Sequence, residues 1–277
     1  MSDRPLRLGL IGQGIGHSLS PMLHRVGLAA LGLAGEYVLF EAPAEADLDR
    51  VVGELRAGAI DGANVTTPYK RAAAQRCDEA PPDGAPINTL WRDAQGRLVG
   101  SSSDGPGLCL ALRRRGVVLA ARRVAILGTG GAAESVGLGL RAAGAELVAV
   151  VGRRPAAAEL VAGRLGAQAL RWDAPPPMAV DLLVHATRIG HGGRADDAGL
   201  ARLHPAWWAG ARAAVDLVYA TESTAFERFG MARGANVLGG IGGEMLAAQA
   251  AISLGWWTGH RPPFDAMRAA LLATRNT

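Results

Sequence analysis

The chain has 277 residues, of which 49% are hydrophobic and 19% are charged. This length predicts about two domains, and the composition excludes a disordered chain because it supplies enough apolar side chains for hydrophobic cores. The net charge of +4 leaves two kinds of anionic partner, a nucleic acid or a small anionic molecule. The arginines are spread along the chain and do not alternate with aromatic side chains. We therefore expect no nucleic-acid partner.

Membrane and metal association are not expected either. No apolar run approaches the roughly 18 residues of a spanning helix, and the strongest, Met245 to Trp257, contains Gln249. No basic segment followed by a long apolar run marks a signal peptide. The only two cysteines, Cys77 and Cys109, match neither a disulfide framework nor a metal site. These features favour a cytoplasmic protein without a bound metal.

The first hundred residues predict an α/β unit. Apolar and β-branched runs predict strands, and apolar residues at helical spacing predict helices between them. The expected strands cover 6–11, 37–40 and 64–67, and the expected helices cover 21–31 and 47–57.

The second part of the chain begins with a helix over 106–115 and then shows the order strand, glycine turn, helix, strand. The pattern predicts strands at 123–127, 146–151, 181–185 and 213–218, with a helix reaching to about residue 143. This order is the opening of a Rossmann unit, which binds dinucleotides. From Met245 onward we expect two helices, interrupted around 259–263.

The glycine turn reads Gly128-Thr129-Gly130-Gly131-Ala132-Ala133. Gly128 permits the tight turn, Gly130 lets the backbone approach a pyrophosphate, and Ala133 takes the small-residue position of helix–strand packing. The following helix presents its N-terminus to the phosphates. The alternative is a purely structural turn, but the strand before it and the helix after it favour a cofactor site.

The end of the next strand indicates which dinucleotide binds. An NAD enzyme usually places an acidic residue there to bind the ribose hydroxyls. This chain has Gly152-Arg153-Arg154 and no acid before Glu159. Two guanidiniums match a 2′-phosphate in charge and geometry, so NADP is the expected cofactor, unless Arg153 and Arg154 are merely two solvated arginines at a turn.

Lys70 is the only lysine among 29 basic residues. Arginine and lysine substitute for each other on a solvated surface, but only lysine gives up its proton readily. A lysine retained in an arginine-rich chain therefore indicates proton chemistry. Chance is the alternative interpretation, but Lys70 also ends a motif, Asn64-Val65-Thr66-Thr67-Pro68-Tyr69-Lys70.

Several further polar segments occur along the chain. His17-Ser18-Leu19-Ser20-Pro21 places two hydroxyls beside a helix N-terminus, where they can hold a carboxylate, although Ser20 could instead cap the helix. The others are Ile87-Asn88-Thr89-Leu90, Ser102-Ser103-Asp104-Gly105, Asp216-Leu217-Val218-Tyr219 and a last helical segment carrying Gln249. Together with the glycine turn and the Lys70 motif, these segments resemble those of the shikimate dehydrogenase family, in the same order and over essentially the whole chain.

The resemblance implies an NADP-dependent oxidoreductase of the chorismate pathway that interconverts 3-dehydroshikimate and shikimate. It implies Lys70 and Asp104 as catalytic residues. Its substrate-binding residues would be Ser18, Ser20, Asn64, Thr66, Asn88, Tyr219 and Gln249, and its cofactor-binding residues Gly128, Gly130, Gly131, Ala132, Ala133, Arg153 and Arg154.

The family fold implies an N-terminal α/β substrate domain and a Rossmann domain, with C-terminal helices returning to the first. We place the substrate domain at 1–104, completed by 240–277, and the cofactor domain at 105–239. The expected partner is a small cyclic polyol acid, and the protein is expected to be a monomer or a homodimer.

Three departures from the family pattern leave alternatives for the substrate. Ser102-Ser103 replaces an Asn-Thr pair, His185-Ala186-Thr187-Arg188 replaces a segment that usually begins with Asn, and Gly152 replaces the Asn before Arg153. A quinate dehydrogenase, or a paralogue acting on another cyclic polyol acid, therefore stays open beside shikimate dehydrogenase. A catalytically silent binding protein is disfavoured because Lys70 and Asp104 are both present.

Overall fold

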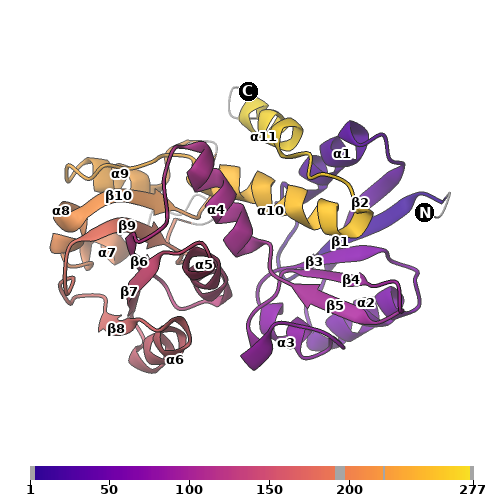
Figure 1. The fold of residues 1–277 in the computed structure, drawn as a ribbon, viewed down its shortest axis with the longest axis horizontal. Helices are drawn as coiled ribbons and strands as arrows, with labels where there is room; N and C mark the ends of the chain where they lie inside the picture. Colours follow the sequence, from indigo (N-terminus) through magenta and orange to yellow (C-terminus); the bar gives the residue numbers. More distant parts are fainter. Residues whose placement is uncertain (1–3, 191–196, 221, 275–277) are drawn as a thin grey trace. The chain divides into compact units, whose positions relative to one another are not determined.

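The computed structural model describes residues 4–190, 197–220 and 222–274 (Figure 1). The chain divides into two compact units, one formed by Met1–Gly107 with Ala247–Thr277 and the other by Leu108–Leu246. Each contains a five-stranded sheet with helices, which confirms the α/β prediction. These limits lie a few residues from the predicted domain boundaries. Among the described residues, no helix is both long and apolar enough to cross a membrane.

The sheet of the first unit is mixed, with the order β2-β1-β3-β4-β5. Its parallel strands are β1 (Leu6–Gly12), β2 (Gly35–Glu41) and β3 (Gly62–Val65). The last two strands, β4 (Thr89–Arg92) and β5 (Leu98–Ser101), are antiparallel to their neighbours. They form a hairpin that places Asn88 and the segment 102–104 at one end of the sheet.

Helices cover both faces of this sheet. Helices α2 (Glu45–Arg56) and α3 (Lys70–Ala74) pack on one face through Leu48, Val51 and Ala73. Helices α1 (Ser20–Ala30) and α10 (Ile241–Thr258) pack on the other through Leu28 and Leu254. The last helix, α11 (Phe264–Ala273), lies against α1. The C-terminal part of the chain therefore completes the first unit.

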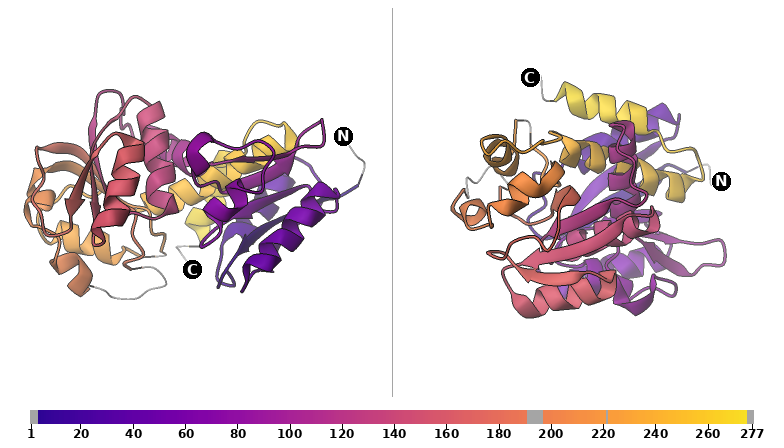
Figure 2. Two further views of the ribbon diagram at one scale, coloured as in Figure 1. Left: turned by 90° about the horizontal axis from the view of Figure 1, so that it is seen from below. Right: turned by 60° about the vertical axis from the view of Figure 1, so that its left-hand side comes forward.

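The sheet of the second unit is fully parallel, with the order β10-β9-β6-β7-β8. Its strands are β6 (Arg123–Leu127), β7 (Glu146–Gly152), β8 (Gln168–Arg171), β9 (Val180–His185) and β10 (Ala211–Asp216). Figure 2 shows this sheet between two layers of helices. The order places β6 at the centre: β7 and β8 follow on one side of it, and β9 and β10 lie on the other. Ligands of such folds bind beside the carboxyl ends of the strands, at the point where the strand order reverses.

One helical layer consists of α4 (Asp104–Arg114), α5 (Gly131–Ala142), α6 (Pro155–Leu165) and the start of α10. The other consists of α7 (Asp197–Ala201), α8 (Ala206–Gly210) and α9 (Ala225–Met231). Successive residues of β6 alternate between the two cores, as the pleat of a strand requires: Val124 and Ile126 face one, and Ala125 and Leu127 face the other.

Local sequence signals explain the ends of several helices. Pro155 begins α6, and Gly166 ends it in the left-handed conformation at φ 67°. Proline is common in the first turn of a helix and glycine just after its last turn. Thr224 caps α9 by accepting from the backbone N–H of Glu227, whose side chain returns a bond to the Thr224 N–H. This reciprocal pair is a capping box.

Candidate active site

Lys70 and Asp104 meet in the first unit. Lys70 is the first residue of α3, directly after the loop that follows β3, and Asp104 is the first residue of α4. The Lys70 ammonium donates a hydrogen bond to Asp104 Oδ2, and the two side chains are 15% and 8% exposed. The pair is therefore largely, but not fully, removed from solvent, which leaves access for a small molecule.

Asn88 holds the other oxygen of this carboxylate. Its side-chain N–H donates to Asp104 Oδ1 at 2.9 Å and to Gln249 Oε1 at 3.1 Å. Its side-chain oxygen, Oδ1, accepts from the backbone N–H of Ser103 at 2.7 Å and from the Thr89 hydroxyl at 2.9 Å. Asn88 therefore fixes the orientation of Asp104 and joins it to α10.

A second buried amide, Asn64, continues this network. Asn64 Oδ1 accepts from the Tyr37 hydroxyl at 2.8 Å, and Asn64 Nδ2 donates to Ser253 Oγ at 3.0 Å. Ser253 is fully buried and also lies 2.8 Å from Thr89 Oγ1 and 3.0 Å from Ser103 Oγ. Burial raises the pKa of Tyr37 well above its usual range, so this phenol remains a neutral donor.

Ser18 and Ser20 form a pair at the start of α1. The Ser18 hydroxyl lies 3.1 Å from Ser20 Oγ and accepts from the Ser20 backbone N–H at 3.2 Å. Ser20 is the first helical residue and makes no capping bond, so the capping alternative does not describe this helix. The preceding loop is held by Glu41, whose carboxylate accepts from the backbone N–H groups of Gly14 and Ile15.

His24 lies one helical turn after Ser20 in α1 and is fully buried. Its ring stacks on Tyr37 with centroids 4.1 Å apart and planes at 4°. Neither ring nitrogen has a hydrogen-bond partner among the residues that the structure describes. Burial lowers the pKa of His24 to about 3, although the Asn64 side chain acts in the opposite direction. This histidine is therefore neutral at physiological pH.

The glycine turn of the second unit has the geometry that a dinucleotide requires. Gly128 has φ 134°, and a Cβ there would lie 2.7 Å from the Ala186 carbonyl oxygen. A Cβ at Gly130 would meet nothing within 4 Å, so the backbone is open to a ligand at that point. Gly131 begins α5, no side chain caps this helix, and Ala133 is fully buried against β6. The N–H groups at this helix end can therefore serve a phosphate.

Arg153 and Arg154 follow directly on β7, and Arg154 is the N-cap of α6. Both are exposed, and neither forms an ion pair with a residue in the described ranges. Arg164, at the other end of α6, does have a carboxylate partner in Glu134. Two cations beside the glycine turn, without a carboxylate partner among the described residues, suit an anionic group. Tyr219 is half-buried and lies three residues after the end of β10.

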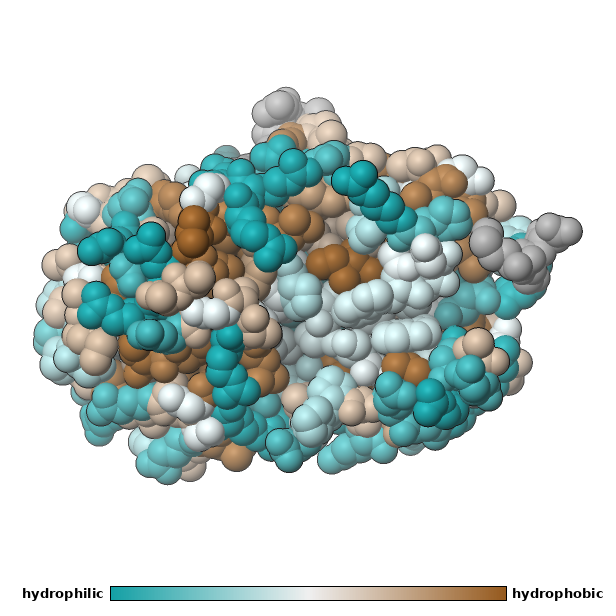
Figure 3. Space-filling model, viewed as in Figure 1, coloured by the Kyte–Doolittle hydropathy of each residue, from teal (hydrophilic) through white to brown (hydrophobic). Residues whose placement is uncertain are grey.

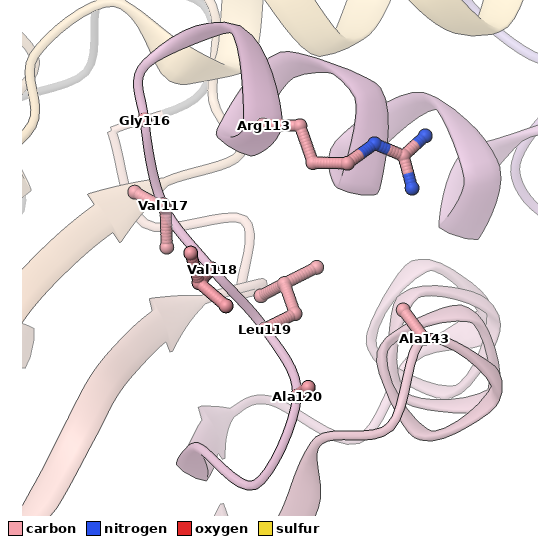
Figure 4. Close-up of a pocket in the computed structure, with 7 residues that line it drawn as sticks. All are labelled: Arg113, Gly116, Val117, Val118, Leu119, Ala120 and Ala143. Atoms are coloured by element: carbon pink, nitrogen blue, oxygen red, sulfur yellow. The ribbon is translucent and has the colours of Figure 1, made fainter.

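The second unit also has an open cavity of about 440 Å³, lined by Arg113, Gly116, Val117, Val118, Leu119, Ala120 and Ala143 (Figure 4). It lies at the C-terminal end of α5, about 18 Å of helix away from the glycine turn, and at the amino ends of the strands. Figure 3 shows apolar surface on this unit among separate hydrophilic patches. The cavity contains none of the predicted site residues.

Comparison with known proteins agrees with this arrangement. A model of the shikimate dehydrogenase substrate binding domain matches residues 10–90, and one of the shikimate 5′-dehydrogenase C-terminal domain matches 242–272. Two relatives named shikimate dehydrogenase (NADP(+)) are from Rubrobacter xylanophilus, 37% identical over 95% of this chain and 94% of that protein, and Thermus thermophilus, 36% identical over 96% and 97%. The chain belongs to the shikimate dehydrogenase family.

A solved structure of this family is similar over nearly its whole length. The Thermus thermophilus shikimate 5-dehydrogenase, in complex with NADP(H) and shikimate, has a TM-score of 0.81 at 35% identity and covers 96% of this chain and 98% of its own. The predicted membership of the family is therefore confirmed.

The structure brings together most of the site residues that the sequence predicted in the first unit, namely Asn64, Lys70, Asn88, Asp104 and Gln249. Thr66 is half-buried, and its methyl group lies where a Cβ on Gly12 would be; no side-chain hydrogen bond joins it to this network. Tyr37, Thr89 and Ser253 also belong to this network, although they are not among the predicted site residues. Ser253 follows Gln249 by one helical turn, but α10 is apolar nearly all round, so this spacing alone did not indicate a site residue.

Proposed function

We propose that this chain is an NADP-dependent shikimate dehydrogenase that interconverts 3-dehydroshikimate and shikimate. The observation that carries the proposal is the ion pair between Lys70, the only lysine of the chain, and Asp104. The relatives named for this activity support it, because they match this chain over nearly its whole length.

Reduction of a ketone needs a proton donor and a positive neighbour for the developing alkoxide. When bound, NADPH supplies the hydride. Lys70 supplies both other requirements, because its ammonium gives the proton to the carbonyl oxygen and stabilises the charge that forms there. Asp104 orients Lys70 and accepts a hydrogen bond from a neighbouring substrate hydroxyl. In the oxidative direction, Lys70 takes the proton back.

The other polar residues would bind the substrate. Ser18 and Ser20, with Tyr219, would hold the carboxylate. The ring hydroxyls would be bound by Asn64, Thr66, Asn88, Asp104 and Gln249. Neutral amides and hydroxyls suit a polyol because each can donate and accept. Their mutual hydrogen bonds, such as Asn88 with Gln249, support the proposal because they hold the amides in fixed orientations before substrate arrives.

NADP would occupy the second unit. Gly128, Gly130, Gly131, Ala132 and Ala133 would surround the pyrophosphate, and Arg153 and Arg154 would bind the 2′-phosphate. The open space above Gly130 and the unpaired state of the two arginines support this placement. On this proposal, residues 1–104 with 240–277 form the substrate domain and 105–239 the NADP domain. The protein would act in the cytoplasm as a monomer or homodimer.

One observation favours a second candidate substrate, quinate. Ser102 occupies the position where the family pattern has Asn, and its buried hydroxyl has no hydrogen-bond partner in the part of the chain that the structure describes. Ser102 is shorter than Asn and lies unpartnered beside Asp104, so the substrate pocket there restricts the shape of its ligand less. A related saturated acid with one more hydroxyl would then also be accepted.

An oxidation assay with purified protein tests the proposal. Shikimate and quinate are each offered with NADP and with NAD, and reduced cofactor is followed by absorbance. We expect the highest kcat/KM for shikimate with NADP. A higher kcat/KM for quinate would establish the second candidate, and turnover of neither acid would assign the chain to another polyol acid.

A further inference from the structure

A buried polar network lies at the carboxyl end of the sheet in the second unit. His185 and Asp216 are the last residues of β9 and β10 and face each other in the ladder. His185 Nδ1 lies 2.8 Å from Asp216 Oδ1, and both side chains are fully buried. Because a carboxylate only accepts, Nδ1 carries the hydrogen. The imidazole also stacks on Phe226, with centroids 4.6 Å apart and planes at 3°.

Asp216 is held by three donors. Besides His185, the backbone N–H of Val218 donates to Oδ1 at 3.0 Å and the Thr224 hydroxyl donates to Oδ2 at 2.6 Å. Thr224 is in turn the N-cap of α9. A buried carboxylate is stable only when its oxygens are satisfied in this way. His185 is therefore attached to a rigid group rather than to a mobile side chain.

The other ring nitrogen reaches the turn that follows β9. His185 Nε2 lies 2.6 Å from Thr187 Oγ1, which accepts from the backbone N–H of Ile189 at 3.1 Å. The intervening Ala186 donates its N–H to the Leu127 carbonyl at 2.8 Å. The Ala186 carbonyl oxygen lies 2.7 Å from the position of a Cβ on Gly128. The turn over 186–189 thus packs directly on the first glycine of the nucleotide turn.

We propose that His185 is a positioning residue for the nicotinamide cofactor, acting through Thr187. Its imidazole joins the fixed Asp216 carboxylate to the Thr187 hydroxyl and so holds the turn over 186–189 against Gly128. This inference rests on the proposed function, because it takes the glycine turn as the NADP site. The bond from Nε2 to Thr187 carries this link between the sheet and the turn.

Two pairs of variants distinguish the contribution of the Nδ1 bond to Asp216 from that of the Nε2 bond to Thr187. His185→Asn keeps a donor near the Nδ1 position but lacks an atom at the Nε2 position, whereas His185→Gln reaches the Nε2 position. Thr187→Val removes the hydroxyl at nearly equal volume, and Thr187→Ser retains it. One lost hydrogen bond corresponds to a 3- to 10-fold change in affinity, on the order expected for a neutral pair.

The experiment measures the Kd of NADPH directly, by titration without substrate, together with the melting temperature. We expect His185→Asn and Thr187→Val each to raise the Kd about 3- to 10-fold. The double variant should be no weaker than either single one, because both remove the same bond. His185→Gln and Thr187→Ser should bind more tightly than their partners His185→Asn and Thr187→Val.

Trp208→Phe is the matched control. Trp208 is buried in the same core with its ring centroid 4.9 Å from that of Phe226, and its indole nitrogen has no hydrogen-bond partner among the described residues, so it takes no part in the polar network. It should lower the melting temperature and leave the Kd of NADPH unchanged. If the His185 and Thr187 variants behave like this control, His185 is only a core residue and the proposal is overturned. If the wild-type protein binds no NADPH, the proposed function fails with it.

Discussion

Asp104 receives a different donor on each of its two carboxylate oxygens, the Lys70 ammonium on Oδ2 and the Asn88 amide, at 2.9 Å, on Oδ1. Asn88 is itself fixed by Ser103 and Gln249. The position of Lys70 is therefore determined by a chain of buried hydrogen bonds that ends in α10. Changes at remote members of this chain should alter catalysis without touching Lys70.

Replacement of Arg153 and Arg154 by Ala tests the choice of cofactor. Both guanidiniums are exposed and follow β7 directly, so their loss should not disturb the fold. We expect the KM for NADPH to rise at least tenfold, since a charge-assisted bond to phosphate contributes about 1.5–3 kcal/mol, and the KM for NADH to change little. Equal increases for the two cofactors would show that neither arginine contacts the 2′-phosphate.

Ser102→Asn tests the substrate preference. An amide can provide the bonds that the unpartnered Ser102 hydroxyl lacks, so the ratio of kcat/KM for shikimate to that for quinate should rise about tenfold. Ser103→Thr should change this ratio less, because Ser103 already bonds Asn88 and Gln249. The double variant should resemble Ser102→Asn. An unchanged ratio in the double variant would mean that these serines do not set the specificity.

Ser253→Ala tests the network behind the substrate site. The change removes the hydroxyl that bonds Asn64 and Ser103, so kcat/KM for shikimate should fall about 3- to 10-fold while the KM for NADPH stays constant. Thr258→Ala is the control, because the Thr258 hydroxyl donates to the Leu254 carbonyl and accepts from the His260 backbone N–H, neither of which belongs to this network. Comparable losses of activity in both variants would point to general weakening of α10 instead.

His24 predicts a pH dependence of stability. Its pKa is lowered by burial from 6.5 to about 3, so between these values the unfolded state binds more protons than the folded state. The free energy of unfolding should therefore fall as the pH decreases below 6.5, by up to about 1.4 kcal/mol per pH unit from this group. The loss should stop near pH 3, where both states are protonated.

Urea unfolding at pH 7.5 and pH 5, both roughly chosen to bracket the ordinary histidine pKa, measures this effect. His24→Phe should reduce the difference between the two pH values, because phenylalanine keeps the stack on Tyr37 without a titrating group. Equal pH dependence in wild type and His24→Phe would contradict the account.

The sequence predicted the parts of the fold that depend on local pattern. The strands and helices that were predicted follow apolar periodicity, and most of their bounds differ from the prediction by only a few residues, whereas helix α6 was not predicted. Strands β4 and β5 were not predicted because each has four residues, joined by a turn over 93–96. Strand β8 is a partly exposed edge strand, and its apolar signal is correspondingly weak.

The site residues also divide into those that a local sequence motif indicates and those that only the folded chain brings together. Lys70, Asn88 and Asp104 belong to ordered motifs, and so they could be named from the sequence. Ser253 could not, because α10 is apolar nearly all round, and only the folded chain shows that this serine turns toward Asn64. Its role depends on contacts between residues 189 positions apart in the chain.

The most direct test of the central claim is the kcat for shikimate oxidation with NADP by wild type, Lys70→Met and Lys70→Arg, with folding verified by circular dichroism. Removing a general acid–base group costs about 10²–10⁴-fold in rate, and guanidinium cannot give up its proton at working pH. We therefore expect both variants to lose at least about a hundredfold in kcat while still binding shikimate. A kcat near the wild-type value in either variant would contradict the assignment of Lys70 as the proton donor and acceptor.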